Sequence, residues 1–410
     1  MGILLSGTGV DGTMGLKAIK ACGGFTIVQG TDGSAPGFSG MPDSAISAGV
    51  VDFVVPAGKI PEKLRSLLGN GTPTDTSADT DDESESSLSA RKEICALLVR
   101  QLGHDFSGYK HNTFMRRVRR RMQVLELERL ADYVLVLRQD AEEAAALFRD
   151  LLIGVTYFFR DADAFSTLAQ QVVPKLFEGK GANDTVRIWI PGCASGEEAY
   201  SLAILMREHL DATGSQAKVQ IFATDIDEPA LAIARSGHYP VSLLSSVSPE
   251  RLARFFTGDD ATKSIANSIR QMCMFSSHNL LRDPPFSRID LVSCRNLLIY
   301  FGVGFQARAF PIFHFALKPG GHLFLGTSET VSQHGELFSP VDRKSRIFQR
   351  RDHVIARLQF PPSPAGRRGS IFGSSNGPPD ATAEARGIVE ARLLDRHVPA
   401  HVVVNREGDV

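Results

Sequence analysis

RIWIPGCASGEEAYSLAILM, residues 187–206, joins an apolar run, a turn of small residues and a helix-like run without a break. The order strand, turn, helix is the first half of a β-α-β unit. Because Gly, Cys, Ala and Ser fill the turn, a ligand can approach the backbone there, and the following helix, expected from Glu197, offers free N–H groups at its start. Gly192 is therefore a candidate ligand contact, although a tight connection without a ligand also fits this motif.

The next strand-like run, IFATDID (221–227), carries the acid Asp225 at its end. In doubly wound folds an acid at this position hydrogen-bonds ribose hydroxyls, whereas a lone Asp after a strand often caps a helix instead. The glycine turn one β-α unit earlier favours the ribose interpretation. That turn lacks the G-x-G-x-x-G pattern, and Glu197 and Glu198 would repel a pyrophosphate. Together the two motifs indicate an adenosine ligand without a diphosphate, such as S-adenosylmethionine.

Outward from these motifs, short apolar runs alternate with longer helical stretches. The strand-like runs are RIWIP, VQIFAT, RIDLVSC and GHLFLG. This alternation predicts an α/β fold whose Rossmann-like sheet is doubly wound and mostly parallel, over residues 181–350. Residues 90–180 instead carry apolar residues at helical spacing, which predicts an N-terminal helical subdomain.

Two polar stretches divide the chain into three pieces. Residues 69–89 contain six acids and no basic residue, and Pro, Gly and Ser dominate much of residues 351–383. Neither stretch can bury enough apolar surface to offset its ordering entropy, so we expect both to be linkers. Before them, residues 1–68 have the pattern of a small α/β unit, and after them residues 384–410 have a helix-like and one strand-like run.

The run HNTFMRRVRRRM (111–122) concentrates positive charge. On a helix Phe114, Val118 and Met122 would line one face, and the arginines would fan around the rest. These arginines are Arg116, Arg117, Arg119, Arg120 and Arg121. A charge run often marks only a solvated face, but here no acid intervenes and like charges cost helix stability, so an acidic partner is the economical explanation. Nucleic acid is disfavoured because aromatic interleaving is missing.

The composition excludes several classes of protein. The chain has 410 residues, enough for two to four domains, with 22% charged and 43% hydrophobic residues and a formal net charge of −1. Five cysteines without C-x-x-C spacing argue against a disulfide framework and a metal site, and favour a reducing cytoplasm. No apolar run approaches the length of a membrane helix, so we expect no direct membrane insertion.

Residues 90–350 resemble the chemotaxis receptor methyltransferases (CheR type), which use S-adenosylmethionine to methylate glutamate side chains of chemoreceptors. The motifs that carry the resemblance are HNTFMRRVRRRM, GVTYFFRD, PGCASGEEAYSLAI, FATDIDEPAL, ARSGHY, SSHNLLRDPPF, DLVSCRNLLIYF and LKPGGHLFLGTSE, in the family's order. By this resemblance the cofactor contacts are Thr156, Arg160, Glu197, Asp225, Asn279, Leu280, Arg295 and Asn296. Gly154 departs from the family, since many members have Asn there.

The resemblance also implies a partner and an insertion. The partner is the set of acidic methylation helices in a chemoreceptor's cytoplasmic domain, which the arginine run would contact. The insertion is a small β-subdomain near 238–276, and because it lacks a G-x-G loop we do not expect tethering to a receptor's C-terminal peptide.

Methyl transfer from a sulfonium to a carboxylate oxygen is an in-line displacement. Glutamate, with a reference pKa of about 4.3, is already ionised at neutral pH, so no general base is required. Catalysis should rest on alignment and exclusion of water. Tyr300, soon after the DLVSC run, is the candidate to line the methyl path, and an aromatic that only closes the core fits equally well.

Residues 1–68 contain the motifs LLSGTGVDGTMGLKAIKACGG, FTIVQ, GMPDSAI and GVVDFVVP. With these motifs they resemble the last part of a chemotaxis receptor methylesterase (CheB type), and we expect a truncated domain. Asp11 matches the Asp of that family's Ser-His-Asp triad, but the segment contains no histidine, so we expect no methylesterase activity. Residues 384–410 faintly resemble the start of a PAS sensory domain, also truncated, as in fused CheB/CheR/PAS proteins.

The sequence therefore favours a cytoplasmic protein-glutamate O-methyltransferase of chemotaxis signalling. One alternative is a methyltransferase of the same fold that acts on a small molecule, against which the arginine run argues. The other is a catalytically silent adaptor that senses S-adenosylmethionine or docks receptors.

Overall fold

The computed structural model describes residues 1–9, 12–30, 36–69, 85–152, 154–259 and 261–352. They belong to the first of two compact units, which spans residues 1–360. Asp11, the central part of the expected linker at 69–89, and all that was expected beyond residue 352 lie outside the described residues. Among the described residues, every helix is too short or too polar to serve as a membrane span.

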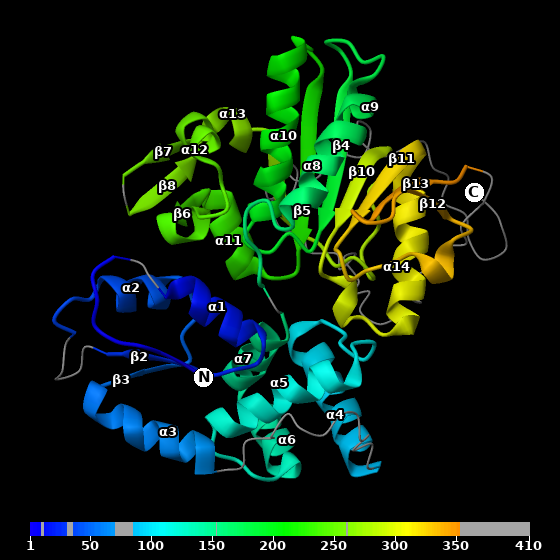
Figure 1. Cartoon of the computed structure of the whole chain (residues 1–410). Coiled ribbons are helices and arrows are strands. Elements are labelled where there is room, and N and C mark those ends of the chain that lie inside the picture. The colour runs from blue at the N-terminus through cyan, green and yellow to red at the C-terminus, as the bar shows by residue number, and fades with distance from the viewer. Residues whose placement is uncertain (10–11, 31–35, 70–84, 153, 260, 353–410) are drawn as a thin grey trace, which may run out of the picture. The chain divides into compact units, whose positions relative to one another are not determined.

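A seven-stranded sheet organises residues 154–352 (Figure 1). Its strand order is β12-β13-β11-β10-β4-β5-β9, and neighbouring strands from β11 to β9 run parallel. The strands are β4 (Thr185–Pro191), β5 (Lys218–Asp225), β9 (Cys273–Ser277), β10 (Ile289–Cys294), β11 (Leu317–Leu325), β12 (Phe338–Asp342) and β13 (Ile347–Arg350). This arrangement confirms the expected α/β fold with a doubly wound, mostly parallel sheet.

The three strands that the sequence did not single out lie at or near the edges of this sheet. β9 forms one edge, and the antiparallel pair β12 and β13 completes the other. An edge strand need not read as a continuous apolar run, because its outer side is not covered by another strand. Pro340 within β12 is tolerated for the same reason, since an edge strand can spare a ladder N–H.

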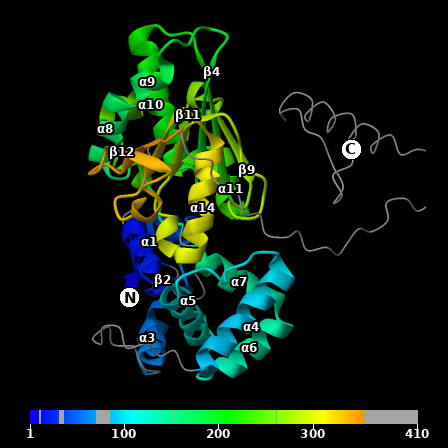
Figure 2. The ribbon, with the colours of Figure 1, turned by 90° about the vertical axis from the view of Figure 1, so that its right-hand side faces the viewer.

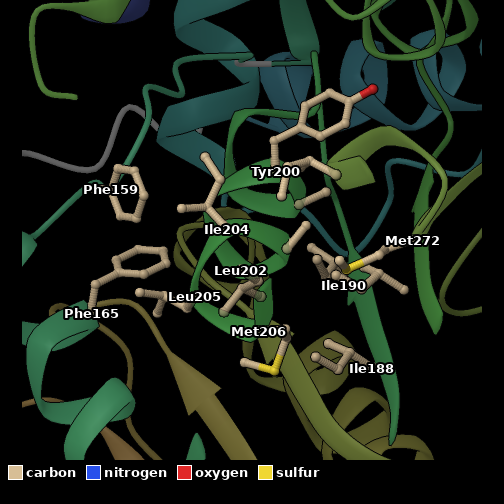
Figure 3. Packing of buried hydrophobic residues seen from close by; sticks show 14 of the residues in the cluster. Phe159, Phe165, Ile188, Ile190, Tyr200, Leu202, Ile204, Leu205, Met206 and Met272 are labelled. Atoms are coloured by element: carbon tan, nitrogen blue, oxygen red, sulfur yellow. The ribbon is translucent and has the colours of Figure 1, made fainter. Parts of the chain in front are cut away.

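Successive residues of β4 pack into two separate cores. Ile188 and Ile190 lie in the first core and Trp189 in the second, because side chains alternate across a strand. Figure 3 shows side chains of α10, among them Leu202 and Met206, beside these two isoleucines. The first core is closed by α8 (Ala162–Gln171), α9 (Val173–Phe177), α10 (Glu197–Thr213) and α11 (Glu228–Ser236).

The second core joins the sheet to the helical subdomain. Trp189 is fully buried in it and donates from Nε1 to Thr224 Oγ1 at 3.1 Å. Its helices are α14 (Val303–Ala316) from the sheet domain and α4 (Glu85–Leu102), α5 (His111–Val124), α6 (Leu130–Gln139) and α7 (Ala141–Leu151). Figure 2 shows α14 next to the sheet from a second direction.

Two expected boundaries differ in the structure. Helix α4 begins at Glu85, within the expected linker 69–89, because Ser87 already packs inside the fold. The helical subdomain ends with α7 and not at residue 180, because α8 and α9 pack on the sheet in the first core.

Between α11 and β9 the chain forms the expected small β-subdomain. Its three antiparallel strands pair in the order β6-β8-β7. The elements are β6 (His238–Pro240), η2 (Val241–Leu244), α12 (Pro249–Phe255), β7 (Phe256–Gly258), β8 (Thr262–Ile265) and α13 (Asn267–Arg270).

Residues 1–69 form a small α/β segment with a parallel three-stranded sheet in the order β1-β2-β3. Its elements are β1 (Gly2–Leu4), α1 (Thr13–Ala21), β2 (Thr26–Gln29), α2 (Gly40–Ser47), β3 (Phe53–Val55), η1 (Ala57–Lys59) and α3 (Ile60–Gly69). Two small apolar clusters lie in this segment, and Val124 of α5 packs against one of them.

Candidate functional site

The turn after β4 is fixed by backbone bonds to the neighbouring strand. The N–H groups of Gly192 and Cys193 both donate to the carbonyl oxygen of Thr224, at 2.7 and 3.0 Å. Gly192 has φ +76°, and a Cβ built there would lie 3.0 Å from Leu297 Cδ2. A side chain at Gly192 would meet both backbone strain and a steric contact. The turn therefore holds a set position beside the end of β5.

The inserted β-subdomain supports the same turn. The Tyr239 hydroxyl on β6 donates to the carbonyl oxygen of Ser195 at 2.6 Å. Gly196, which precedes α10, has φ +93°, and a Cβ there would lie 2.8 Å from the Ala234 Cβ. Both ends of the turn are thus held by groups distant in the sequence.

Asp225 ends β5, and backbone N–H groups bind its carboxylate. Oδ2 accepts from the Ala194 N–H at 2.7 Å, and Oδ1 accepts from Ile226 and Asp227 at 2.7 and 3.0 Å. A carboxylate has about four acceptor positions, so one on Oδ2 has no donor among the described residues. Burial raises the pKa of Asp225, and the backbone bonds partly oppose that shift. The helix cap is Asp227 instead, which accepts from the Ala230 N–H at 3.1 Å.

Asp225 lines a cavity of about 80 Å³ at the carboxyl end of the sheet. Four of the predicted cofactor residues line it together: Gly192, Asp225, Asn279 and Leu280. Most of the remaining wall is apolar or aromatic, including Phe301 and Phe305. An apolar lining with a few polar groups is typical of small-molecule sites, but those sites usually enclose roughly 300–1,000 Å³, so this cavity has to widen around a ligand the size of a nucleoside.

The loop before α5 supplies a wall of this cavity that the sequence reasoning missed. His104, Asp105, Phe106 and Tyr109 line it. The rings of Phe106 and Tyr109 meet edge to face with centroids 4.9 Å apart, and Tyr109 forms a β-bridge to Phe301. The signal in the sequence was the run GHDFSGY (103–109), which places two aromatic residues in a loop before the arginine helix.

Thr156 and Glu197, two more predicted cofactor residues, meet at one point outside this cavity. Glu197 is fully buried at the start of α10, and the Ser195 hydroxyl lies 2.9 and 2.8 Å from its two carboxylate oxygens. The Lys17 ammonium of α1 lies 3.7 Å from Glu197 Oε1 and donates to the Thr156 carbonyl at 3.2 Å. A buried carboxylate needs such partners, so this is a place where a cation is stabilised.

Arg295 follows β10 and its side chain is fully buried. The guanidinium lies 5.0 and 4.7 Å from the ring centroids of Phe165 and Phe324, and Nη2 pairs with Asp161 at 2.6 Å. Nε and Nη1 have no hydrogen-bond partner among the described residues. Buried polar atoms are normally satisfied, so these two are candidates for contact with a ligand or an ordered water.

Tyr300 is half-buried at the end of η3 (Leu298–Tyr300). Burial raises the pKa of Tyr300, and the positive charges of Arg160 and Arg117 oppose that shift. Arg160 donates from Nη1 to the Val155 carbonyl at 2.7 Å. Tyr300 thus lies within the electrostatic reach of Arg160, from the predicted cofactor motif, and of Arg117, from α5. Its position beside the methyl path stays a prediction.

Two of the five α5 arginines are buried and do not fan outward as expected. Arg120 is 3% exposed and forms ion pairs with both Asp52 and Asp150. Arg117 is 2% exposed and donates to the Lys20 carbonyl at 2.9 Å. The physical reason is that residues 1–69 supply Asp52 and Lys20, which the pattern of α5 alone does not reveal.

The other three arginines differ among themselves. Arg121 is half-buried and donates from Nε to Glu143 at 3.0 Å, whereas Arg116 and Arg119 are exposed. Beside them lies a cavity of about 530 Å³ whose charged lining residues are Lys17, Lys20, Asp52, Arg117, Arg121, Arg149, Asp150 and Asp227. Three acids in its lining offset part of the positive charge of this cavity. The exposed Arg116 and Arg119 are therefore the α5 arginines most accessible to an acidic partner.

The methylesterase-like segment contributes no imidazole to a triad. Residues 1–68 contain no histidine, and Asp11 lies outside the described residues. The Ser6 hydroxyl accepts a hydrogen bond from the Phe38 N–H at 2.9 Å. Among the described residues, no group of three or more His, Cys, Asp or Glu side chains is arranged to hold a metal ion.

Three known families match successive parts of the chain. Residues 154–347 match the CheR methyltransferase, SAM binding domain, and residues 90–152 match the CheR methyltransferase, all-alpha domain. Residues 1–64 match the CheB methylesterase family.

Individual relatives cover different shares of the chain. A chemotaxis protein methyltransferase of Salmonella typhimurium is 33% identical over 60% of this chain and 86% of its own length. Chemotaxis protein methyltransferase 1 of Pseudomonas aeruginosa is 36% identical over 48% of this chain and 73% of its own length. An uncharacterized 104.1 kDa protein of Rhodobacter capsulatus is 37% identical over 85% of this chain, which spans 38% of that protein.

Proposed function

The chain belongs to the CheR methyltransferase family, and on that premise we propose that it transfers the methyl group of S-adenosylmethionine to glutamate side chains of chemoreceptors. The observation that carries the proposal is Asp225, whose carboxylate is tied to the turn after β4 and reaches the cavity with one acceptor position open. An acid at this place in a doubly wound sheet suits a ribose hydroxyl.

The residues present fit this cofactor. Asp225 and Asn279 give the cavity polar groups for an adenosine, and Leu280 with Phe106 gives it apolar and aromatic walls. We assign Glu197, buried at the start of α10, to the cationic methionine end by the family motif, and in that role the methionine amine takes the place near Glu197 that the Lys17 ammonium holds here. We also assign Thr156, Arg160, Gly192, Arg295 and Asn296 to cofactor binding, in keeping with the family motifs.

The cofactor supplies a methyl group on a sulfonium, and the chain's own residues provide alignment. A substrate glutamate arrives ionised at neutral pH, so none of these residues needs to remove a proton. Tyr300 lines the approach in this proposal, and the nearby Arg160 and Arg117 attract the incoming carboxylate. Alignment of the two reacting groups in a water-poor site then accounts for the rate.

The partner in this proposal is the acidic methylation region of a chemoreceptor's cytoplasmic domain, which implies a cytoplasmic enzyme. Arg116 and Arg119 support it, because both are exposed on α5 with no acid nearby in the sequence. Exposed charges of this kind contribute more to the rate of encounter than to affinity.

The test is transfer of labelled methyl to a receptor. The whole chain, S-adenosylmethionine with a tritiated methyl group and a purified receptor cytoplasmic domain are mixed, and base-labile methyl ester is measured as released methanol. We expect label on the receptor, greatly reduced in Asp225→Asn. A receptor that stays unlabelled while the chain binds the cofactor would contradict the proposed activity and favour a silent adaptor.

A further inference from the structure

The loop that joins β10 to α14 carries three residues with proposed roles. Arg295 and Asn296 are assigned to the cofactor, and Tyr300 to the methyl path. Asn296 has φ +60°, a backbone conformation that few residues other than Gly and Asn adopt. Such a loop needs an outside group to hold it, because a short stretch with an unusual backbone does not fix itself.

One carboxylate, Glu329, gathers the backbone N–H groups of this loop. Oε1 accepts from Leu298 at 2.7 Å and from Ile299 at 3.3 Å. Oε2 accepts from Asn296 at 2.9 Å and from Gly326 at 2.7 Å. These four bonds match the four acceptor positions of an ionised carboxylate.

The surroundings of Glu329 leave little freedom for it to move. Its side chain is buried, with the residue 4% exposed. A Cβ built on Gly326 would lie 2.8 Å from Asn296 Nδ2 and 2.9 Å from both the Asn296 backbone nitrogen and Glu329 Oε2, closer than real Cβ contacts. Glycine at position 326 therefore lets the turn after β11 come close to the loop, so that Glu329 can reach the loop's N–H groups.

The carbonyl groups of the loop have a different partner. Gln306 on α14 donates from Nε2 to the carbonyls of Leu298 and Phe301, at 2.9 and 3.0 Å. Gln306 does not bind the N–H groups. The Tyr300 carbonyl accepts from the Lys110 N–H at 2.9 Å, and the Arg295 side chain pairs with Asp161. Glu329 is the group that binds the N–H groups of Asn296, Leu298 and Ile299 between these two residues.

We propose that Glu329 is a positioning residue for methyl transfer, which holds residues 296–299 so that Arg295, Asn296 and Tyr300 keep their places around the cofactor. The role of those three residues rests on the function proposed above. Glu329 itself acts through the backbone and does not need to touch cofactor or substrate.

Glu329→Gln tests the role with little change of shape. The amide has only one acceptor oxygen, and its NH₂ group would face two N–H donors. We expect kcat for receptor methylation to fall about 100-fold, as a misplaced site can cost, and the Kd for S-adenosylmethionine to rise roughly tenfold. Glu329→Asp keeps the charge with a shorter reach, so its kcat should fall between those of wild type and Glu329→Gln.

Asp290→Asn is the matched control. Asp290 is also a buried carboxylate of the same region, but it precedes the loop by most of strand β10 and accepts from the Arg187 N–H at 2.8 Å and from Lys180 and Lys318. Its loss should lower the melting temperature and leave kcat of the folded enzyme within about twofold of wild type. Gly326→Ala, which keeps the Glu329 charge but pushes on the loop, should copy Glu329→Gln.

Assays run well below all melting temperatures separate the outcomes. A fall in kcat and in cofactor affinity for Glu329→Gln and Gly326→Ala, with Asp290→Asn unaffected, supports the positioning role. Equal losses in Glu329→Gln and Asp290→Asn, or wild-type kcat and Kd in Glu329→Gln, overturn it. If wild type methylates no receptor, the proposed activity fails, and calorimetric S-adenosylmethionine binding by the same variants still decides whether Glu329 positions the loop.

Discussion

The carboxyl edge of the sheet and helix α5 hold buried charge in opposite ways. At the sheet edge, backbone N–H groups bind the carboxylates of Asp225 and Glu329. On α5, carboxylates from other segments bind the long side chain of Arg120. Backbone N–H groups at the end of a sheet fix the position of a bound carboxylate closely. A long arginine side chain between two acids instead joins the segments that carry those acids. The comparison suggests that the first region aligns a reaction and the second mainly links residues 1–69 to the helical subdomain.

The largest effect should come from Arg120→Ala. The change removes the cation that Asp52 and Asp150 share. Asp52 keeps Lys20 at 3.2 Å, so unfolding in urea should show a loss at the lower end of the range for a broken buried pair, about 3 kcal/mol. The exposed neighbour Arg116→Ala is the control and should change stability by no more than about 0.5 kcal/mol. Equal and small losses of unfolding free energy in both variants would mean that Arg120 does not link residues 1–69 to the helical subdomain.

Asp225→Ala should weaken cofactor binding by roughly tenfold to a hundredfold. It removes both the open ribose acceptor and the bond that ties Ala194 to β5, and charged hydrogen bonds contribute about 1.5 to 3 kcal/mol. Calorimetry with S-adenosylmethionine measures the loss. Asp227→Ala, two residues further on, removes only a helix cap, so it should cost about 1 kcal/mol of stability and leave Kd within about twofold. Unchanged affinity in folded Asp225→Ala would exclude Asp225 from the site.

Cofactor affinity should also depend on pH. Burial raises the pKa of Asp225 despite three opposing backbone bonds, and only the ionised form keeps the acceptor position on Oδ2 open for a hydroxyl while it holds those three bonds. As pH falls through that raised pKa, binding should weaken at values above about 3.9, where an ordinary aspartate titrates. Binding isotherms from pH 7 downward measure this. The Asp225→Asn variant should bind weakly with a flatter pH profile, and an identical profile in both proteins would assign the titration to another group.

The smallest effect should come from the exposed arginines. Replacing Arg116 and Arg119 together with Ala should lower receptor methylation a few-fold at low salt and less at high salt, because exposed charges are screened. The Kd for S-adenosylmethionine should not change. Full-rate methylation at low salt would show that these two side chains form only a solvated face and would leave the sheet edge as the sole functional region of the comparison.

The sequence predicted the sheet edge better than it predicted α5. The turn and Asp225 lie in local motifs, because the strand, turn and helix that position them are consecutive in the chain. Glu329 ends the motif LKPGGHLFLGTSE but received no role, since that role depends on a loop some thirty residues earlier, with which it shares no sequence pattern. Tyr109 escaped for the same reason, since it meets Phe301 only in the folded chain.

On α5 the periodicity predicted one face and missed another. Phe114, Val118 and Met122 are buried as the helical spacing indicates. Arg117 and Arg120 are buried as well, because residues 1–69 contribute Lys20 and Asp52 beside them. The hydrophobic periodicity of one helix indicates which side is apolar. It does not indicate whether other segments of the chain cover the polar sides.

The second core gives this molecule an optical reporter of its own. Trp189 is the only tryptophan in the chain, it is fully buried, and its indole N–H is bonded to Thr224, the residue before Asp225. Tryptophan fluorescence, excited where tyrosine does not absorb, therefore comes from a single indole next to the cofactor edge and within the core shared by sheet and helices. A red shift on denaturation would follow the joint opening of both domains, and a change in intensity on titration with S-adenosylmethionine would follow binding without a label.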